Sequence, residues 1–204
     1  AGKIEIINAP CDVSEVAKDV LRLFRGRAEN KGLILKLESG SSAQNWNRLT
    51  DARALRQVLS NLVGNAVKFS DGGTVTIFLN ESQAADAVPP ILELAVQDEG
   101  IGIPQDAQDL VFKRFEQAGN VSAGSYSGSG LGLSIVQTLV QAMGGTMTLT
   151  SGAGTGSTFT LRLPMAIAEA DDDLTALPAP EGQPVLYNHV LVVEDNDTNL
   201  IITR

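Results

Sequence analysis

Three polar residues recur at helical spacing within an apolar stretch, and their side chains are suited to binding a phosphorylated ligand. Asn61, Asn65 and Lys68 are four and three residues apart, so on a helix they lie on one face. Asparagine is a poor helix former, so two of them at this spacing indicate a binding role. An amide oxygen is a ligand that Mg²⁺ accepts while it keeps most of its waters, and a lysine ammonium suits a phosphate group. Considered alone, the same residues also fit an ordinary solvated helix face.

A carboxylate followed by two glycines forms a second candidate site. Asp98 comes directly after a predicted strand over residues 92–97, and Gly100 and Gly102 follow it. An aspartate at a strand end can accept a hydrogen bond from an exocyclic amine such as that of adenine. Glycine permits positive φ and lets a flat ligand approach the backbone closely. The plainer interpretation is a tight turn with a capping aspartate.

A glycine-rich turn leads into a predicted helix over residues 134–143 and could bind an anion. Gly128, Gly130 and Gly132 precede this helix, whose first N–H groups and positive dipole end would face the ligand. The turn does not follow a strand, which disfavours a dinucleotide-binding Rossmann unit, and the sequence contains no P-loop motif.

The segment before this turn has the composition of a mobile flap. Residues 116–130 hold four glycines and four serines with few apolar side chains. Phe112 and Phe115 lie just ahead of it, on either side of Lys113 and Arg114. In isolation such a pair of phenylalanines is more often part of a core than of a ligand site.

Apolar periodicity and turn residues predict the elements that would position these motifs. Helices are expected over residues 12–30, over 55–70 with Asp51 as its cap, over 104–110 and over 134–143. Strands are expected over residues 4–7, 33–38, 74–79, 92–97, 146–151 and 157–163. Residues 39–47 and 81–90 are expected to be loops.

Composition limits the classes of function that the chain can have. With 204 residues and 43% hydrophobic content the chain can build one sizeable core, and its net charge of −9 argues against binding nucleic acid. No apolar run approaches the roughly 20 residues of a membrane helix, so no membrane contact is expected from this segment. The single cysteine, Cys11, favours a reducing compartment, and we expect a cytoplasmic location for this part of a longer protein.

The C-terminal part of the sequence changes character. Residues 166–187 are rich in Ala, Asp and Pro and are predicted to be a linker. Residues 188–204 contain a β-branched run that ends in Glu194 and Asp195, typical of the first strand of an α/β domain with a Mg²⁺ site. This last stretch is too short to bury a core by itself, and His189, the only histidine, is predicted to be a surface residue.

The order of these motifs resembles that of the ATP-binding catalytic domain of sensor histidine kinases. The resemblance covers residues 1–165 and rests on Asn61-x-x-x-Asn65-x-x-Lys68-Phe69, Asp98-x-Gly100-x-Gly102, Phe112-x-x-Phe115, Gly128-x-Gly130-x-Gly132-Leu133 and Gly154-x-Gly156-Ser157-Thr158-Phe159. Residues 188–204 resemble the truncated start of a receiver domain, as in hybrid histidine kinases. The resemblance implies an α/β two-layer sandwich of the histidine-kinase and gyrase type. Its sheet would be mixed and mostly antiparallel, with helices on one face.

The resemblance also implies ATP and Mg²⁺ as ligands and gives roles to individual residues. Asp98 would read the adenine amine, with Thr158 supporting it through water. Asn65 would coordinate Mg²⁺, and Lys68 would face phosphate. The remaining nucleotide-binding positions would be Gly100, Gly102, Gly128, Gly130, Leu131, Gly132 and Leu133, with Phe112 and Phe115 anchoring the flap.

The implied activity is transfer of the ATP γ-phosphate to a histidine on a separate dimerisation domain, with a receiver domain or response regulator downstream. The catalytic set would be Asn61, Lys68 and Arg114. ATP-hydrolysing members of the superfamily carry a glutamate at position 61, and because Asn61 cannot accept a proton a kinase is favoured over an ATPase. Two alternatives stay open: an ATP-hydrolysing clamp, and a degenerate module that binds nucleotide without efficient transfer. The second is suggested by the flap, which has no cation between Gln117 and Gly130.

Overall fold

Helix α2 (Ala52–Phe69), which carries Asn61, Asn65 and Lys68, is the central element of the helical layer. It contacts α1 (Val13–Glu29) on one side, α3 (Gly132–Ala142) on the other, and strands of the sheet beneath it. The computed structural model describes residues 4–40, 46–81, 89–112 and 131–168, and structural statements refer to these residues. By its contacts the chain divides into one unit, Ala1–Ala170, and a second, Asp171–Arg204, which lies outside the described residues.

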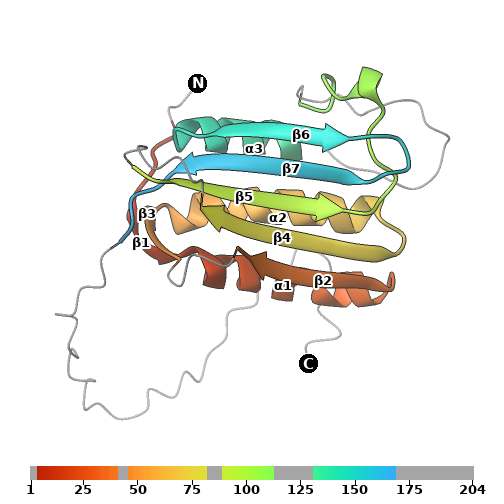
Figure 1. Cartoon of the computed structure of the whole chain (residues 1–204), viewed down its shortest axis with the longest axis horizontal. Coiled ribbons are helices and arrows are strands. Elements are labelled where there is room, and N and C mark those ends of the chain that lie inside the picture. Colours follow the sequence, from red (N-terminus) through yellow and green to blue (C-terminus); the bar gives the residue numbers. More distant parts are fainter. Residues whose placement is uncertain (1–3, 41–45, 82–88, 113–130, 169–204) are drawn as a thin grey trace, which may run out of the picture. The chain divides into compact units, whose positions relative to one another are not determined.

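A five-stranded sheet supports the helices. Its strands are β2 (Leu33–Ser39), β4 (Gly73–Glu81), β5 (Ile91–Asp98), β6 (Thr146–Ser151) and β7 (Ser157–Pro164), in the spatial order β2-β4-β5-β7-β6. Only β2 and β4 are parallel, and the other pairs are antiparallel. The three helices cover one face of this sheet (Figure 1). The predicted two-layer sandwich with a mixed, mostly antiparallel sheet is therefore confirmed.

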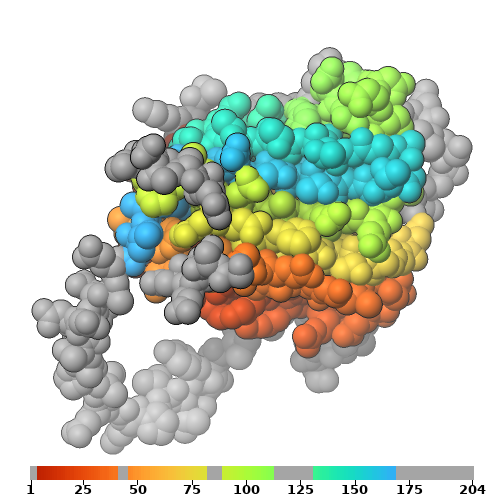
Figure 2. All heavy atoms as spheres, viewed as in Figure 1, coloured from red at the N-terminus to blue at the C-terminus, as the bar shows by residue number. Residues whose placement is uncertain are grey.

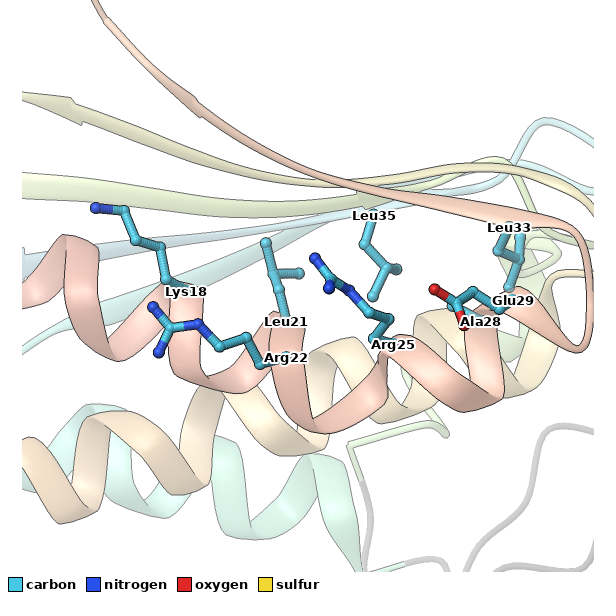
Figure 3. A pocket seen from close by; sticks show the side chains of 8 residues that line it. All are labelled: Lys18, Leu21, Arg22, Arg25, Ala28, Glu29, Leu33 and Leu35. Carbon is cyan, nitrogen blue, oxygen red and sulfur yellow. The ribbon is translucent and has the colours of Figure 1, made fainter.

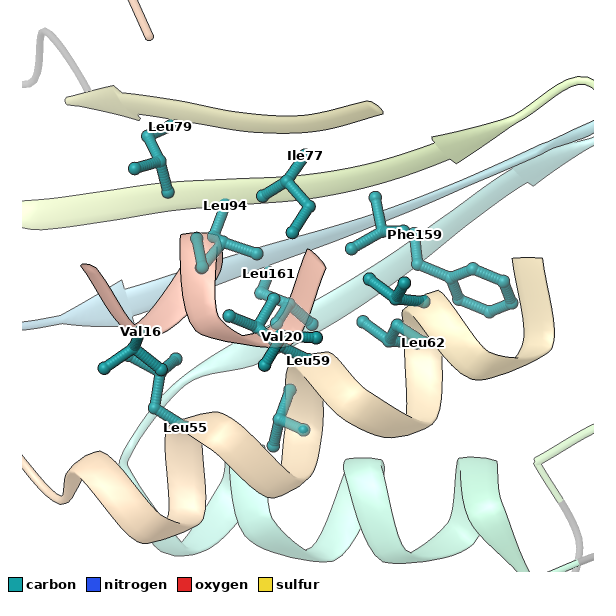
Figure 4. Packing of buried hydrophobic residues seen from close by; sticks show 14 of the residues in the cluster. Val16, Val20, Leu55, Leu59, Leu62, Ile77, Leu79, Leu94, Phe159 and Leu161 are labelled. Carbon is teal, nitrogen blue, oxygen red and sulfur yellow. The ribbon is translucent and has the colours of Figure 1, made fainter. Parts of the chain in front are cut away.

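The core lies between the helices and the sheet. Leu55, Leu59 and Leu62 of α2 are fully buried, and they point toward the apolar side chains of the central strands, including Ile77 and Leu161 (Figure 4). Complete burial of one such side chain contributes about 1.5–3 kcal/mol. This burial fixes the rotation of α2 about its axis, so the same helix holds its polar residues on another side.

A two-stranded sheet that the sequence did not predict packs at one end of the domain. Residues 4–8 are not in a strand, contrary to expectation, and strand β1 (Ala9–Asp12) starts later and includes Pro10. It pairs with β3 (Asn47–Thr50), which begins at the end of the stretch expected to be a loop. Both strands are edges of a two-stranded sheet, and a proline without an N–H is tolerated there. Four-residue strands paired across the sequence carry too little periodicity to be predicted.

A buried arginine stabilises this end of the domain. Arg48 of β3 is only 1% exposed, forms an ion pair with Glu81, and donates from Nη1 to the Asn47 carbonyl at 2.9 Å. Its guanidinium lies 5.9 Å from the ring centre of Trp46. An arginine is rarely buried unless its charge is paired.

The expected helix over residues 104–110 is shorter than predicted. The structure has a single 3₁₀ turn, η1 (Gln105–Ala107), followed by hydrogen-bonded turns. No side chain caps its start at Pro104, and no residue of η1 is buried. A segment that packs no apolar stripe onto the core has little to extend it into an α-helix.

Asp51 caps α2 and gives a test of how this helix is stabilised. Its carboxylate accepts hydrogen bonds from the N–H groups of Arg53 and Ala54, at 2.9 and 3.1 Å, and from Ile7 at 3.1 Å. We expect Asp51→Ala to lower the free energy of unfolding by about 1–2 kcal/mol at neutral pH, measured by urea denaturation. The exposed Asp109→Ala is the control and should change it by less than about 0.5 kcal/mol.

The contribution of Asp51 should depend on pH in one direction. Burial alone would raise the pKa of Asp51, but the three N–H donors and the Arg53 charge outweigh it and hold the pKa below its usual value of 3.8. The stabilisation is therefore present above the usual pKa and is lost as pH falls through the lower pKa of the folded protein. The difference in the free energy of unfolding between wild type and Asp51→Asn should shrink as the pH falls. A difference that grew on acidification would contradict this account.

Candidate functional site

The first residue of α3 lies against the two predicted amide ligands of α2. A Cβ placed on Gly132 would be 3.7 Å from Asn61 Oδ1 and 4.0 Å from Asn65 Nδ2. The start of α3 and the polar stripe of α2 therefore meet, although they are about 70 residues apart in the sequence. Their meeting brings together three of the residues selected from sequence.

One of the two amides at this junction, that of Asn61, has hydrogen-bonding capacity available for a ligand. Asn61 Nδ2 is buried and has no hydrogen-bond partner among the described residues. Buried amide groups in native proteins are nearly always paired, so an unpaired one at a predicted site is consistent with a bound ligand. Lys68 lies half-buried in the last turn of the same helix, with Nζ 4.8 Å from the ring centre of Phe69.

Helix α3 starts without a side-chain cap. Its N-cap residue is Leu131, which makes no side-chain cap hydrogen bond, and the Ser134 hydroxyl donates to the Leu131 carbonyl at 2.9 Å. The N–H groups of the first turn are thus not satisfied by a capping side chain, as an anion site requires. Leu133 packs partly buried against the core, which indicates a packing role for this residue. Gly128 and Gly130 lie outside the described residues.

Asp98 ends β5 in a buried position. It is 8% exposed, and its Oδ1 accepts hydrogen bonds from the N–H groups of Gly100 at 2.9 Å and Ser157 at 3.2 Å. Burial raises the pKa of the Asp98 carboxyl above its usual value, and the two N–H donors only partly offset this effect. A buried carboxylate held by backbone donors on one oxygen can present its remaining acceptor positions to an amine.

Thr158 is not placed to support Asp98, contrary to expectation. The antiparallel register of β5 and β7 sets Ser157 opposite Asp98 and sets Thr158 opposite Gln97. Directly opposed residues share a face of the sheet, and successive residues alternate between faces. Thr158 therefore points to the outer face, away from the helices, which is the side seen in Figure 2. Ser157 is the residue opposite Asp98, and its backbone N–H donates to the carboxylate. The sequence alone could not distinguish two registers that differ by one residue.

The two glycines after Asp98 serve the packing of the chain itself. A Cβ on Gly100 would lie 2.5 Å from the Phe69 carbonyl oxygen, and one on Gly102 would collide with the Gly152 carbonyl oxygen. Gly102 also has a φ of 66°, which disfavours other residues. Close approach of neighbouring backbone is thus sufficient to require these glycines, and their close approach to a ligand stays a prediction.

Side-chain hydrogen bonds hold the loop after Asp98 to the turn between β6 and β7. The Ser151 hydroxyl accepts from the Ile103 N–H and donates to the Gly156 carbonyl, both at 2.8 Å. Gln108 Nε2 donates to the carbonyls of Ile103 and Ser151, at 3.0 and 2.9 Å. Asp98 is therefore followed by a fixed loop. Sequence reasoning missed Ser151 and Gln108, which belong to no motif.

Phe112 packs against the core beside this loop. Its ring meets that of Phe159 edge to face, with ring centres 6.5 Å apart and planes at 83°. This contact fits the expected anchoring of the segment that follows. Lys113, Arg114 and Phe115 lie outside the described residues, as does the predicted flap.

A separate groove lies between α1 and the edge strand β2 and contains none of the predicted site residues. Figure 3 shows Arg25 reaching into it between Leu21 and Leu35. Among the described residues there is no group of three or more His, Cys, Asp or Glu side chains that could hold a metal ion. In the same part of the chain no helix is long and apolar enough to cross a membrane.

A family profile described as "Histidine kinase-, DNA gyrase B-, and HSP90-like ATPase" matches residues 50–167. This range includes α2, Asp98 and the start of α3. Among solved structures, the chain is similar to the full-length histidine kinase ShkA in complex with AMPPNP. The TM-score is 0.68 and the identity 33%, over 83% of this chain and 34% of that one.

Two curated relatives align along nearly the entire chain. The virulence sensor protein BvgS of Bordetella parapertussis is 35% identical over 209 residues, which is 100% of this chain and 17% of that protein. The aerobic respiration control sensor protein ArcB of Escherichia coli is 36% identical over 205 residues, 99% of this chain and 25% of that protein. The chain thus spans a quarter or less of these relatives. It belongs to the histidine kinase-, DNA gyrase B- and HSP90-like ATPase family, as a catalytic domain of the sensor histidine kinase type.

Proposed function

We propose that this chain binds Mg·ATP and donates the γ-phosphate to a histidine on a separate dimerisation domain of the same protein. The observation that carries this proposal is the junction of Gly132 with Asn61 and Asn65, where an uncapped helix start meets two amides. Phosphoryl transfer depends mostly on positioning and on neutralising charge, so a site made of amides, N–H groups and one lysine is sufficient chemically.

The adenine base would be recognised at the end of β5. Asp98 Oδ1 is occupied by two backbone N–H groups, which leaves acceptor capacity on the carboxylate for the exocyclic amine of adenine. Guanine presents a carbonyl oxygen at the same position, which an ionised carboxylate repels. The Ser157 hydroxyl, in place of Thr158, would bind a water beside the base.

The phosphates and the metal would lie at the junction of α2 and α3. Asn65 would coordinate Mg²⁺ through its amide oxygen, and Lys68 would contact phosphate. Mg²⁺ usually keeps several waters and takes its other ligands from substrate phosphates, so one protein ligand fits it. The N–H groups of Leu131 and Gly132 would hold phosphate oxygens, together with those of Gly130. The metal would neutralise charge that develops on the phosphates during transfer.

The residue types favour transfer over hydrolysis. Asn61 occupies the position from which a base would activate water, and an amide cannot accept a proton at neutral pH. The nucleophile would therefore be the histidine of the dimerisation domain. Arg114 would supply positive charge in place of a cation from the flap. A receiver domain or response regulator is a further proposed partner, because residues 188–204 resemble the start of a receiver domain.

The domain boundaries that we propose are 1–165 for the catalytic domain, 166–187 for a linker, and 188–204 for the start of a receiver domain. The family match ends at residue 167, and the alignments with BvgS and ArcB continue through the C-terminal residues. We propose a cytoplasmic location for this part of the protein. Residues 190–204 are not expected to fold as an independent, cooperative unit.

Replacing Asp98 tests recognition of the base. We expect Asp98→Asn to weaken ATP binding at least about tenfold by calorimetry, equal to about 1.4 kcal/mol. The amide oxygen would take the place of Oδ1 against the two backbone N–H groups, so a donor NH₂ would face the adenine amine. Asp109→Asn, at an exposed position, is the control and should bind as wild type. Unchanged affinity of Asp98→Asn would refute the proposed base site.

The pH dependence of the same variant separates binding from folding. Because burial raises the pKa of Asp98, wild-type affinity should fall as pH is lowered through that raised pKa, and this part of the profile should be missing from Asp98→Asn. The same raised pKa has a consequence for folding. A carboxyl whose pKa is higher in the folded than in the unfolded protein lowers the stability of the fold at a pH where it is ionised. Asp98→Asn should therefore be at least as stable as wild type at neutral pH.

Replacing Asn65 tests the metal site. In wild type, Mg²⁺ should increase ATP affinity, and in Asn65→Ala this increase should shrink severalfold while metal-free binding changes less. The reason is that the variant removes the one protein ligand proposed for the ion. Asn30→Ala, at the exposed end of α1, serves as the matched control. If Mg²⁺ increased the ATP affinity of wild type and of Asn65→Ala by the same factor, Asn65 would be excluded as the ligand.

The transfer reaction can be tested by joining the chain to its histidine-bearing domain. With γ-labelled ATP we expect label on histidine, stable in base and lost in acid, and only slow phosphate release from the chain alone. ATP binding without any phosphohistidine would favour a nucleotide-binding module. Rapid phosphate release without the histidine domain would favour an ATP-hydrolysing clamp.

A further inference from the structure

The residue that follows α2 carries a buried hydroxyl that no motif explains. Ser70 is 0% exposed, and its Oγ has no hydrogen-bond partner among the described residues. Its backbone groups are satisfied, because its N–H donates to the Ala66 carbonyl at 3.1 Å and its carbonyl accepts from Lys31 Nζ at 3.0 Å. The hydroxyl is therefore not needed to end the helix. Native proteins rarely leave such a group unpaired without a functional reason.

The Ser70 hydroxyl is directed to the same place as the Asp98 carboxylate. A Cβ on Gly100 would lie 2.8 Å from Ser70 Oγ and 2.9 Å from Asp98 Oδ1, so the two oxygens are at most 5.7 Å apart. Two oxygens that share one bridging water are separated by up to about 5.5 Å. This upper bound is close to the separation that one water bridges, and both oxygens lie against Gly100, so the hydroxyl and the carboxylate are neighbours in the folded chain.

The carboxylate needs such a donor. Among the described residues it accepts from the N–H groups of Gly100 and Ser157, both on Oδ1, whereas an ionised carboxylate offers about four acceptor positions. No lysine or arginine makes an ion pair with Asp98 among the described residues. A further hydroxyl donor would favour the ionised form and would fix the orientation of the carboxylate.

We propose that Ser70 is a positioning residue of the purine subsite, whose hydroxyl donates to the Asp98 carboxylate, directly or through one water, when the base is bound. This inference rests on the proposed function, in which Asp98 accepts from the exocyclic amine of adenine. Ser70 does not touch the nucleotide, since it has no exposed surface. It acts on base selectivity, because an oriented, ionised carboxylate attracts the adenine amine and repels the carbonyl oxygen of guanine.

The test compares ATP and GTP binding by calorimetry. We expect Ser70→Ala to weaken ATP binding about five- to tenfold and to leave the weaker binding of GTP unchanged, so that selectivity falls by the same factor. Ser70→Cys, which keeps a weak donor of similar size, should lose less. Ser60→Ala, a half-buried serine on the same helix, is the matched control and should bind as wild type.

A purely structural role for Ser70 gives different results. Removing a buried hydroxyl that has no partner should not lower the urea midpoint, so an ATP defect with an unchanged midpoint supports the inference. Equal losses for ATP and GTP, or unchanged selectivity, would overturn it. If Ser70→Ala is too unstable to measure, the selectivity of Ser70→Cys decides, and wild-type selectivity in that variant counts against the inference.

A double-mutant cycle shows whether Ser70 acts through Asp98. In the Asp98→Asn background, Ser70→Ala should cause no further loss of ATP affinity, since the carboxylate that it positions is already absent. Full additivity of the two losses would overturn the inference. The outcomes also separate the two proposals: an effect of Asp98→Asn without one of Ser70→Ala refutes only this inference, and wild-type protein that binds no ATP refutes both.

Discussion

The orientation of α2 is the constraint on which the rest of the structure depends. Its apolar stripe is buried against the sheet and the other two helices, and this burial decides where Asn61 and Asn65 point. The start of the helix is capped by the residue directly before it, and its end by a lysine that is distant in the sequence. Asp51 accepts from the first-turn N–H groups, and Lys31 Nζ donates to the carbonyls of Val67, Lys68 and Ser70 at 3.1, 2.8 and 3.0 Å. A lysine at a helix C-terminus satisfies unpaired carbonyls and complements the helix dipole.

Three buried polar groups that lower stability lie along the proposed nucleotide site. Asp98 is buried with a raised pKa, and the Asn61 amide and Ser70 hydroxyl are buried without partners among the described residues. Each lowers stability relative to an apolar residue of the same shape. Arg48, by contrast, is buried with its charge paired to Glu81. Departures from good packing that cluster in this way are characteristic of binding sites, where polar groups are arranged for a ligand.

Elements with long periodicity could be predicted from the sequence, and those defined by contacts between distant residues could not. Helices α1, α2 and α3 each bury a regular apolar stripe, and the strands of the main sheet begin and end near turn residues. Strands β1 and β3 have four residues each and exist because they pair with each other. The burial of Arg48 depends on Glu81, which is 33 residues away. Nothing local in the sequence indicates either feature.

The candidate site shows the same division. The spacing of the polar residues and glycines identified candidate positions in the sequence. The face of the sheet on which a strand residue lies depends on the register of strand pairing, which the sequence does not give. Thr158 and Ser157 differ by one position, and only the pairing of β7 with β5 determines that Ser157 faces Asp98. The spacing of Gly100 and Gly102 predicts contact with a ligand, and in the structure their missing side chains also make room for the carbonyls of Phe69 and Gly152. Close approach of two backbone segments cannot be distinguished from close approach of a ligand by sequence alone.

Helix α2 also sets the distance between the two ends of the proposed nucleotide site. Asn61 and Asn65 lie beside the start of α3, and Ser70, at the end of the same helix, lies beside the loop that follows Asp98. With a rise of 1.5 Å per residue, the nine residues from Asn61 to Ser70 span about 13 Å along the axis. The phosphate end and the base end are therefore fixed relative to each other by one rigid element. One inserted residue between them would turn the amides by about 100° relative to Ser70 and would remove them from α3. Because the core fixes the rotation of α2, the packing of its apolar stripe also sets the spacing on which the proposed nucleotide site depends.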